Sequence, residues 1–333
     1  MPVHTTACPR NCYSTCGMLV HVDEGRISRI EPHPGNRATP EGVCLKGLSY
    51  VERVRSQDRV LHPLRRLEGG DHVRVGWDEA FDLIVQRLVQ IRKEWGPKAV
   101  MYYAGSGTKG LLNGAGLHFW RSFGGCTTTY GDLCWPAGLE ATRLTLGDNR
   151  NSAPWDISRA RLIIMWGKNA AETNIHQMPF GHDAIEAGAR LVVIDPRRTE
   201  TTEAAPLWLR PRPGTDGALA LALGHELVRS QRVDEGFVRD RVLGFGEYAS
   251  LVERHGPEWA STVTDVPARD IRALAEWLGS IEPATICAGF GMQRYTNSGQ
   301  TIRAILALLA ITGNIGRPGA CLLYTSPSPR DAT

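Results

Sequence analysis

The sequence predicts an α/β protein in which a small N-terminal domain with a β-hairpin precedes a larger domain built on a parallel sheet. Two observations carry this prediction. Four of the eight cysteines lie within the first 44 residues, around an alternating apolar pattern. From residue 99 onward, short apolar runs alternate with segments of helical periodicity, which is typical of βαβ units on a sheet covered on both faces.

Composition and charge exclude several function classes. Lys and Arg number 38 against 35 Asp and Glu, a net charge of +3, and no long basic block is present, so we expect no nucleic-acid partner. No apolar run is long enough for a membrane helix, so we expect no direct membrane insertion. Residues 1–4 carry no signal-peptide or twin-arginine pattern, which favours a cytoplasmic location.

The first expected element is a β-hairpin over residues 17–32. Residues 18–22 and 27–30 alternate apolar and polar side chains on either side of the turn sequence Asp23-Glu24-Gly25. Cysteines precede and follow this hairpin, where they would staple a domain that lacks a large core of its own. A stretch rich in Arg and Gly over residues 63–70 then indicates a linker or a domain boundary.

A helix is expected over residues 78–95, where Phe81, Val85 and Leu88 share one face and Gly96-Pro97 ends the helix. The alternation of strands and helices follows. Strands are expected at 99–104, 161–166, 191–194 and 285–288, and helices at 111–123, 180–189, 217–229 and 300–311. Residues 321–333 have no periodicity, and we expect a disordered or non-native tail there. The expected domains are therefore 1–62 and 63–320, followed by that tail.

The strongest signal is the spacing Cys-x3-Cys-x3-Cys-x27-Cys of Cys8, Cys12, Cys16 and Cys44. Three close thiolates and one distant thiolate can supply the four ligands of a 4Fe–4S cluster. Zinc is the rival interpretation, but zinc sites usually draw two ligands from each of two knuckles. Four unrelated cysteines are the least favoured alternative. Lys46 is either an ordinary surface lysine or a cation beside the cluster.

The segments over residues 8–17 and 42–47 carry a resemblance. They resemble the N-terminal signature of the molybdopterin oxidoreductases of the dimethyl sulfoxide reductase family, and the resemblance continues to about residue 320. It implies a 4Fe–4S domain that passes electrons to molybdenum or tungsten held by two molybdopterin guanine dinucleotides, on Rossmann-like domains. It also implies that Lys46 lies between cluster and pterin. Members of that family are usually longer, so we expect a C-terminal truncation, a cluster without the full cofactor, and exposed apolar faces.

Cys134 is the candidate ligand of the molybdenum or tungsten. A lone cysteine is more often a small buried residue. The segment over residues 131–138, however, resembles the stretch that supplies the family's protein ligand, and a thiolate is a suitable soft donor. Cys134 is favoured over Cys126 because it precedes the Ala-Gly pair of the family pattern.

Further motifs follow the expected strands, at the sheet edge where open α/β proteins bind ligands. Glycines there let the backbone approach a pyrophosphate, and helix N-termini offer it N–H groups. Each motif alone is typical of a turn, but their order resembles the family's guanine-dinucleotide-binding domains. The candidate cofactor-binding residues are Gly105, Gly107, Asn169, Asp195, Pro196, Arg197, Thr199, Gly214, Asp216, Gly289, Gly291 and Gln293.

The loop over residues 105–110 also fits the dinucleotide pattern G-x-G-x-x-G, which would suggest NAD. An acidic residue does not follow at the distance that pattern requires. The resemblance places this loop near the molybdenum cofactor instead.

The expected function is a two-electron oxidoreductase with a small-molecule substrate and an electron-transfer protein or iron–sulfur subunit as partner. Trp135 follows Cys134, where formate dehydrogenases of the family have His, so a thiosulfate- or polysulfide-reductase-like reaction on a sulfur compound or oxyanion is favoured. Acetylene hydratase, a non-redox relative, needs Asp after its second cluster cysteine, and this sequence has Tyr13 there, so acetylene hydration is not expected. The alternatives are a formate dehydrogenase-like enzyme, a non-catalytic iron–sulfur electron-transfer subunit and a zinc-stapled binding module.

Overall fold

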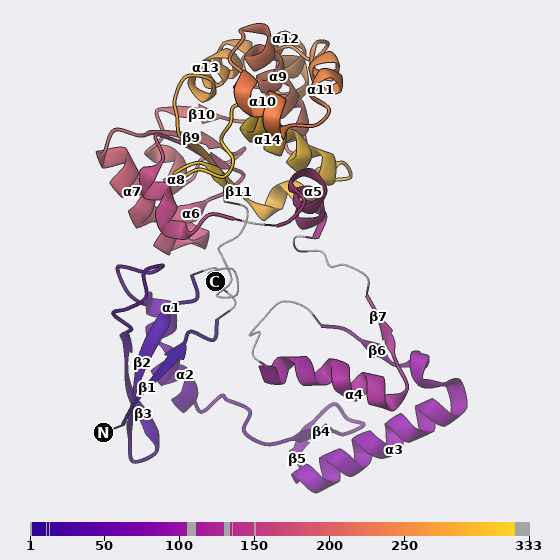
Figure 1. The fold of residues 1–333 in the computed structure, drawn as a ribbon. Helices are drawn as coiled ribbons and strands as arrows, with labels where there is room; N and C mark the ends of the chain where they lie inside the picture. Colours follow the sequence, from indigo (N-terminus) through magenta and orange to yellow (C-terminus); the bar gives the residue numbers. More distant parts are fainter. Residues whose placement is uncertain are drawn as a thin grey trace. The chain divides into compact units, whose positions relative to one another are not determined.

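The structure is a computed structural model, and it describes residues 2–10, 12, 14–104, 111–129, 134, 136–149 and 151–323. Its chain divides into two compact units (Figure 1). Unit 1 comprises residues 1–11, 16–35 and 42–132, and unit 2 comprises residues 12–15, 36–41 and 133–333. Each unit has its own hydrophobic core, and each is described by itself.

Unit 1 begins with a three-stranded antiparallel sheet in the order β1-β2-β3. The expected hairpin is confirmed as β2 (Gly17–Asp23) and β3 (Arg26–Pro32), joined by a turn in which Glu24 and Gly25 have positive φ. Strand β1 (Val3–Ala7) was not expected, because all five of its side chains are exposed and show no apolar alternation. A small core under this sheet consists of Cys16, Met18, Val20, Ile30 and Val43.

The remainder of unit 1 consists of short elements and one long helix. These elements are α1 (Leu45–Leu48), α2 (Tyr50–Arg55), the hairpin β4 (Leu64–Arg66) and β5 (His72–Arg74), α3 (Trp77–Trp95), the parallel pair β6 (Met101–Tyr102) and β7 (Thr127–Thr128), and α4 (Ala115–Phe123). The stretch that we expected to be a linker or a domain boundary therefore forms the β4–β5 hairpin. The helix expected over 78–95 is confirmed as α3, and Gly96, with φ of +82°, follows its last residue.

Helix α3 is covered only in part by other described residues. None of its side chains is buried, and Phe81, Ile84 and Val85 of its apolar stripe are each more than half exposed. Exposed apolar surface of this kind is a usual cause of self-association. The expectation that a missing C-terminal part covers such apolar faces stays a prediction.

Unit 2 is built on a five-stranded sheet in the order β10-β9-β8-β11-β12, in which every neighbouring pair is parallel. The strands are β8 (Leu162–Trp166), β9 (Arg190–Ile194), β10 (Leu207–Leu209), β11 (Ala284–Ala288) and β12 (Cys321–Leu323). The helices are α5 (Pro136–Leu146), α6 (Ala170–Thr173), α7 (Met178–Glu186), α8 (Glu200–Glu203), α9 (Asp216–Arg229), α10 (Glu235–Arg241), α11 (Phe245–Val252), α12 (Pro257–Thr264), α13 (Ala268–Leu278) and α14 (Ser298–Ile311). Figure 1 shows these helices gathered around the sheet.

Alternation along β8 divides the core of unit 2 into two layers. Leu162, Ile164 and Trp166 belong to a cluster that includes the buried residues of α9, α13 and α14. Ile163 and Met165 belong to a second cluster, which includes residues of α7. Successive side chains of a strand point to opposite faces, so the sheet is covered on both faces. The predicted α/β fold class, with an N-terminal antiparallel hairpin domain and a parallel sheet, is therefore confirmed.

Two strands of this sheet were not expected. Strand β10 has three residues, too few for a periodic pattern. Strand β12 begins at residue 321, where we expected a tail, and Cys321 pairs in parallel with Thr285 of β11. The rest of the expected tail, residues 324–333, lies outside the described residues.

Candidate functional site

The candidate site lies at the carboxyl ends of the strands in the unit 2 sheet, and this end is called its carboxyl edge below. From β8 the chain passes to β9 and then β10 on one side, whereas β11 and β12 lie on the other side of β8. The strand order therefore changes direction between β8 and β11. In open parallel sheets, ligands bind in the crevice outside the carboxyl ends of the strands at such a switch point.

The backbones of three strands approach one another closely at this edge. Gly167 donates its N–H to Ile194 O at 2.7 Å, and Gly289 donates its N–H to Trp166 O at 2.8 Å. A Cβ on Gly289 would lie 1.8 Å from Gly167 O. Glycine at position 289 is therefore required by space, since its φ of −91° suits any residue.

Asn169 follows β8 at the switch point and presents an unpaired donor. Ala171 N donates to the Thr201 hydroxyl at 3.2 Å, and this hydroxyl donates to Asn169 Oδ1 at 2.8 Å. The amide oxygen is thereby fixed toward Thr201. Asn169 Nδ2 is buried and has no hydrogen-bond partner. An unsatisfied buried donor is costly, so Asn169 Nδ2 is a candidate partner for a ligand acceptor.

Gln293, which follows β11, presents a second donor of this kind. Its Oε1 accepts the backbone N–H of Gly138 at 2.7 Å, which fixes the orientation of the amide. Its Nε2 is buried and has no partner. Gly138 lies in the first turn of α5, so Gln293 attaches the start of that helix to the end of β11. Part-buried Cys134 lies four residues before Gly138.

The motif after β9 is a tight turn. Asp195 Oδ1 accepts the backbone N–H of Arg197 at 2.8 Å across Pro196, and Thr199 is the N-cap of α8, with its own N–H bonded to the Thr202 hydroxyl at 2.9 Å. Burial raises the pKa of Asp195, and the N–H and charge of Arg197 oppose that rise. In the structure these residues form a turn and begin a helix, which is the role that such a motif alone usually has.

After β10, Asp216 performs a structural task that the sequence did not reveal. Gly214, with φ of +85°, forms the turn before α9. Buried Asp216 then accepts the indole N–H of Trp166 at 2.8 Å, which joins the start of α9 to the end of β8. Burial raises the pKa of Asp216, the Trp166 hydrogen bond opposes that rise, and the nearby charge of Asp195 adds to it.

This buried carboxyl predicts a measurable pH dependence of stability. A raised pKa means that the folded protein binds the proton more tightly than the unfolded chain, so the stability contributed by the neutral form is complete below about pH 3.8 and is lost as the pH rises through the folded pKa. Asp216→Asn keeps an oxygen acceptor for Trp166 and removes the titration. We expect urea unfolding of cofactor-free protein to show a gain in stability for the variant at neutral pH that disappears in acid. Parallel pH profiles of the two proteins would contradict this.

The four candidate cluster cysteines belong to segments of both units. In unit 1, Cys8 donates its N–H to Cys16 O at 2.8 Å, and Cys44 is the N-cap of α1. A Cβ on Gly47 would lie 3.6 Å from Cys8 Sγ, so α1 packs beside Cys8. Lys46 is exposed on α1. Cys12 belongs to the segment 12–15 of unit 2.

No group of three His, Cys, Asp or Glu side chains that could hold a metal ion is present among the described residues. A single zinc would need its ligands gathered on one ion. The ligands of a 4Fe–4S cluster bind different irons, so their sulfurs surround a larger body. The donor set of four cysteines is the one that a 4Fe–4S cluster takes, and the choice between cluster and zinc stays a prediction.

Comparison with known proteins identifies the family. Residues 59–324 match the family model of molybdopterin oxidoreductase, and residues 1–56 match that of the molybdopterin oxidoreductase Fe4S4 domain. The chain belongs to the molybdopterin oxidoreductase family. Its domains are those that hold a 4Fe–4S cluster and a molybdenum or tungsten molybdopterin cofactor.

Relatives within this family have different activities. The chain is 31% identical to dimethyl sulfoxide reductase DmsA of Escherichia coli, over 94% of the chain and 44% of the relative. It is 32% identical to formate dehydrogenase H of the same organism, over 95% of the chain and 45% of the relative. Its fold resembles that of acetylene hydratase from Pelobacter acetylenicus, with a TM-score of 0.72, 26% identity, and coverage of 93% and 43%. The chain spans about half the length of the curated relatives it matches.

Two candidate cofactor-binding residues and two residues used to choose the substrate lie outside the described part of this molybdopterin oxidoreductase chain. They are Gly105, Gly107, Tyr13 and Trp135. Among the described candidates, Asn169 and Gln293 are brought to the switch point with unpaired donors, whereas Gly291 has open space around it.

Sequence reasoning missed a set of buried polar residues behind the switch point. Lys168 is buried, and this burial lowers its pKa, while its electrostatic interaction with Cys287 opposes the shift. Cys287 is fully buried, and Gln177 Nε2 donates to its Sγ at 3.4 Å. A signal was available in the motif Trp166-Gly167-Lys168-Asn169, where a lysine directly follows an apolar strand.

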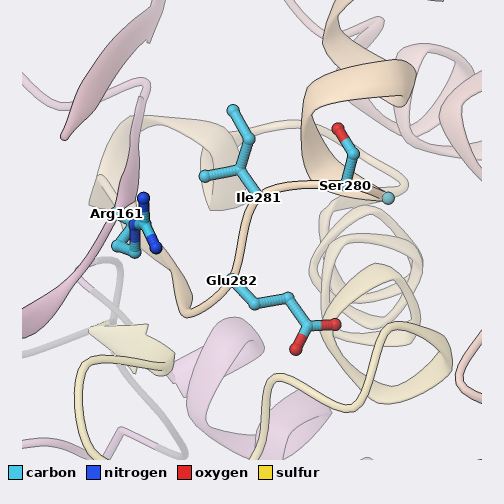
Figure 2. A pocket seen from close by; sticks show the side chains of 5 residues that line it. Arg161, Ser280, Ile281 and Glu282 are labelled. Carbon is cyan, nitrogen blue, oxygen red and sulfur yellow. The ribbon is translucent and has the colours of Figure 1, made fainter. Parts of the chain in front are cut away.

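A separate pocket lies at the opposite edge of the sheet. It is lined by Arg161, which precedes β8, and by residues 279–282, which lead into β11 (Figure 2). Its volume of about 330 Å³ is at the small end for ligand pockets. Since ligands of parallel sheets bind at the carboxyl ends of the strands, this pocket is not the cofactor site. Within the described ranges, no helix has the length and apolar content to cross a membrane.

Proposed function

We propose that the protein is a molybdenum- or tungsten-dependent two-electron oxidoreductase with a 4Fe–4S electron relay. The observation that carries the proposal is the pair of unpaired amide donors, Asn169 Nδ2 and Gln293 Nε2, on either side of the β8–β11 switch point. Both amides are fixed by contacts through their oxygens. They therefore offer N–H groups to the phosphate or heterocycle oxygens of a dinucleotide.

The remaining residues of the edge fit the same cofactor. Gly289 lets two strand ends meet without side chains between them, and Gly291 leaves space beside them. The second oxygen of Asp195 and the N-terminal turn of α9 provide an acceptor and donors for a nucleotide. When bound, the metal–pterin group supplies the redox chemistry, and the protein positions and tunes it.

Cys134 is the proposed protein ligand of the molybdenum or tungsten. The Gln293–Gly138 hydrogen bond holds the start of α5, and Cys134 lies two residues before that helix. Its thiolate is a soft donor suited to this metal. Cys8, Cys12, Cys16 and Cys44 are the proposed cluster ligands, and exposed Lys46 is the proposed cation between cluster and pterin.

The proposed substrate is a sulfur compound or an oxyanion. Trp135 after Cys134 disfavours formate, and a relative named dimethyl sulfoxide reductase is consistent with this choice. The similarity to formate dehydrogenase H keeps formate as the second candidate. The proposed partner is an electron-transfer protein or iron–sulfur subunit, and the cytoplasmic location expected from the sequence stays a prediction.

The test of this function is the reoxidation of a reduced viologen dye by thiosulfate, polysulfide, nitrate or arsenate, with formate-driven dye reduction as the alternative. In preparations that metal analysis shows to contain molybdenum or tungsten, we expect turnover with one of the four oxidants, loss of turnover in Cys134→Ala, and retention in Cys126→Ala. Both variants should keep the cluster iron, because neither cysteine belongs to the cluster. Failure with all four oxidants together with dye reduction by formate would overturn the substrate assignment.

A further inference from the structure

A chain of buried polar side chains runs from Cys12 into the sheet of unit 2. The Cys12 thiol donates to the Ser14 hydroxyl at 3.7 Å, and Ser14 donates to Asn174 Oδ1 at 3.3 Å. Asn174 Nδ2 donates to Gln177 Oε1 at 3.2 Å, and Gln177 Nε2 donates to Cys287 Sγ at 3.4 Å. Every hydrogen bond of the chain points away from Cys12.

The burial of these groups makes the chain energetically significant. Ser14 is 6% exposed, Asn174 4% and Gln177 1%, and Cys287 is fully buried. Hydrogen bonds in such surroundings are poorly screened, and an unpaired member would be costly. This series of hydrogen bonds leads to Cys287, and Lys168 interacts electrostatically with the Cys287 side chain.

The donor-to-acceptor direction of these hydrogen bonds depends on whether the Cys12 sulfur carries a proton. A cysteine that binds iron does so as a thiolate, so it has no proton to donate and instead accepts hydrogen bonds. The same heavy-atom positions then support the opposite direction. Half-turns of the two amides let the Cys287 thiol donate to Gln177, Gln177 to Asn174, Asn174 to Ser14, and Ser14 to the Cys12 sulfur. All members remain paired.

We propose that Ser14 is a positioning residue that donates a hydrogen bond to the cluster ligand Cys12, and that Asn174, Gln177 and Cys287 form the relay that holds the Ser14 hydroxyl in this direction. The inference rests on the proposed role of Cys12 as a ligand. Hydrogen bonds to the sulfurs of an iron–sulfur cluster stabilise its more negative, reduced form. The hydrogen bond from Ser14, held by Asn174, Gln177 and Cys287, therefore raises the reduction potential of the cluster. The cluster then accepts an electron more readily.

The test is a reductive titration of the cluster, monitored by its low-temperature EPR signal, in anaerobically purified protein. In Ser14→Ala we expect the ratio of reduced to oxidised cluster at a fixed poise to fall about tenfold, which is 59 mV for a one-electron couple. Ser14→Thr keeps the hydroxyl and should restore the potential. Ser49→Ala is the matched control, because Ser49 lies five residues from Cys44 and its hydroxyl donates to the backbone oxygen of Lys46 rather than to a cysteine.

Gln177→Met tests the relay at a distance from the cluster. It leaves Ser14 in place but removes the group that orients Asn174, so the potential should fall by less than in Ser14→Ala. The double variant should fall no further than Ser14→Ala, since the donor is already absent. Gln177→Met also decides the question if Ser14→Ala does not fold.

Two results would overturn the inference in distinguishable ways. Clusters of wild-type potential in both Ser14→Ala and Gln177→Met would show that the relay has no effect on the cluster, with the cluster assignment intact. A wild-type chain that holds no iron would overturn the assignment of Cys12 as a ligand, and the inference with it.

Discussion

Gly289→Ala is expected to destabilise folding by about 4 kcal/mol or more, or to prevent it, because the new Cβ would overlap a backbone oxygen. The overlap is with Gly167 O at 1.8 Å, and Gly167 C lies 2.6 Å away. Neither atom belongs to a movable side chain. Relief would require β8 and β11 to separate at their carboxyl ends, where Gly289 N bonds to Trp166 O. The same movement would displace Asn169 from the switch point.

Gly291→Ala is the matched control for this substitution. It lies two residues further along, has open space around the added carbon, and does not have a positive φ. We expect its stability to stay within about 1 kcal/mol of the wild type. Chemical denaturation of both variants, or their soluble yield where one does not fold, gives the comparison. Equal stability of the two variants would contradict the close approach of β8 and β11.

Cys44→Ser is expected to remove most of the iron from the protein. Cys44 caps α1 beside the segment that carries Cys8, and the cluster needs four thiolates. A serine hydroxyl is a far poorer ligand for iron–sulfide chemistry, so the cluster should be lost or degraded. The readout is iron and sulfide content per chain, with the visible absorption of the cluster.

Cys126→Ser is the control for the cluster variant. Cys126 is part-buried like Cys44 but lies in unit 1 outside the proposed set of four. It should retain the wild-type iron content. Wild-type iron content in both variants would show that Cys44 is not a cluster ligand. Loss of iron to the same extent in both variants would indicate that any cysteine substitution in unit 1 disrupts folding.

The sequence predicted the features that short-range patterns encode. The hairpin of β2 and β3 follows from strict alternation around a Gly turn, and β8, β9 and β11 follow from continuous apolar runs that a doubly covered sheet requires. Parallel pairing then placed the motifs after these strands at one edge. Three-residue strands such as β10 escaped prediction because such a length carries no period.

Contacts between residues far apart in the chain could not be predicted. Trp166 and Asp216 are separated by 50 positions, and the bond between them gives Asp216 a structural task that its motif does not reveal. Ser14 and Asn174 are 160 positions apart, and Gln177 and Cys287 are 110 apart. Ser, Asn and Gln are ordinary turn and surface residues in a sequence, so only the tertiary structure shows that they form one buried chain.

The most direct test of the account is the metal content of the anaerobically purified protein, measured for iron, molybdenum, tungsten and zinc together with its low-temperature EPR spectrum. The account predicts about four irons per chain and the signal of a reduced 4Fe–4S cluster. Zinc without iron, and no cluster signal, would contradict it, because the four N-terminal cysteines would then hold a structural zinc instead of an electron relay.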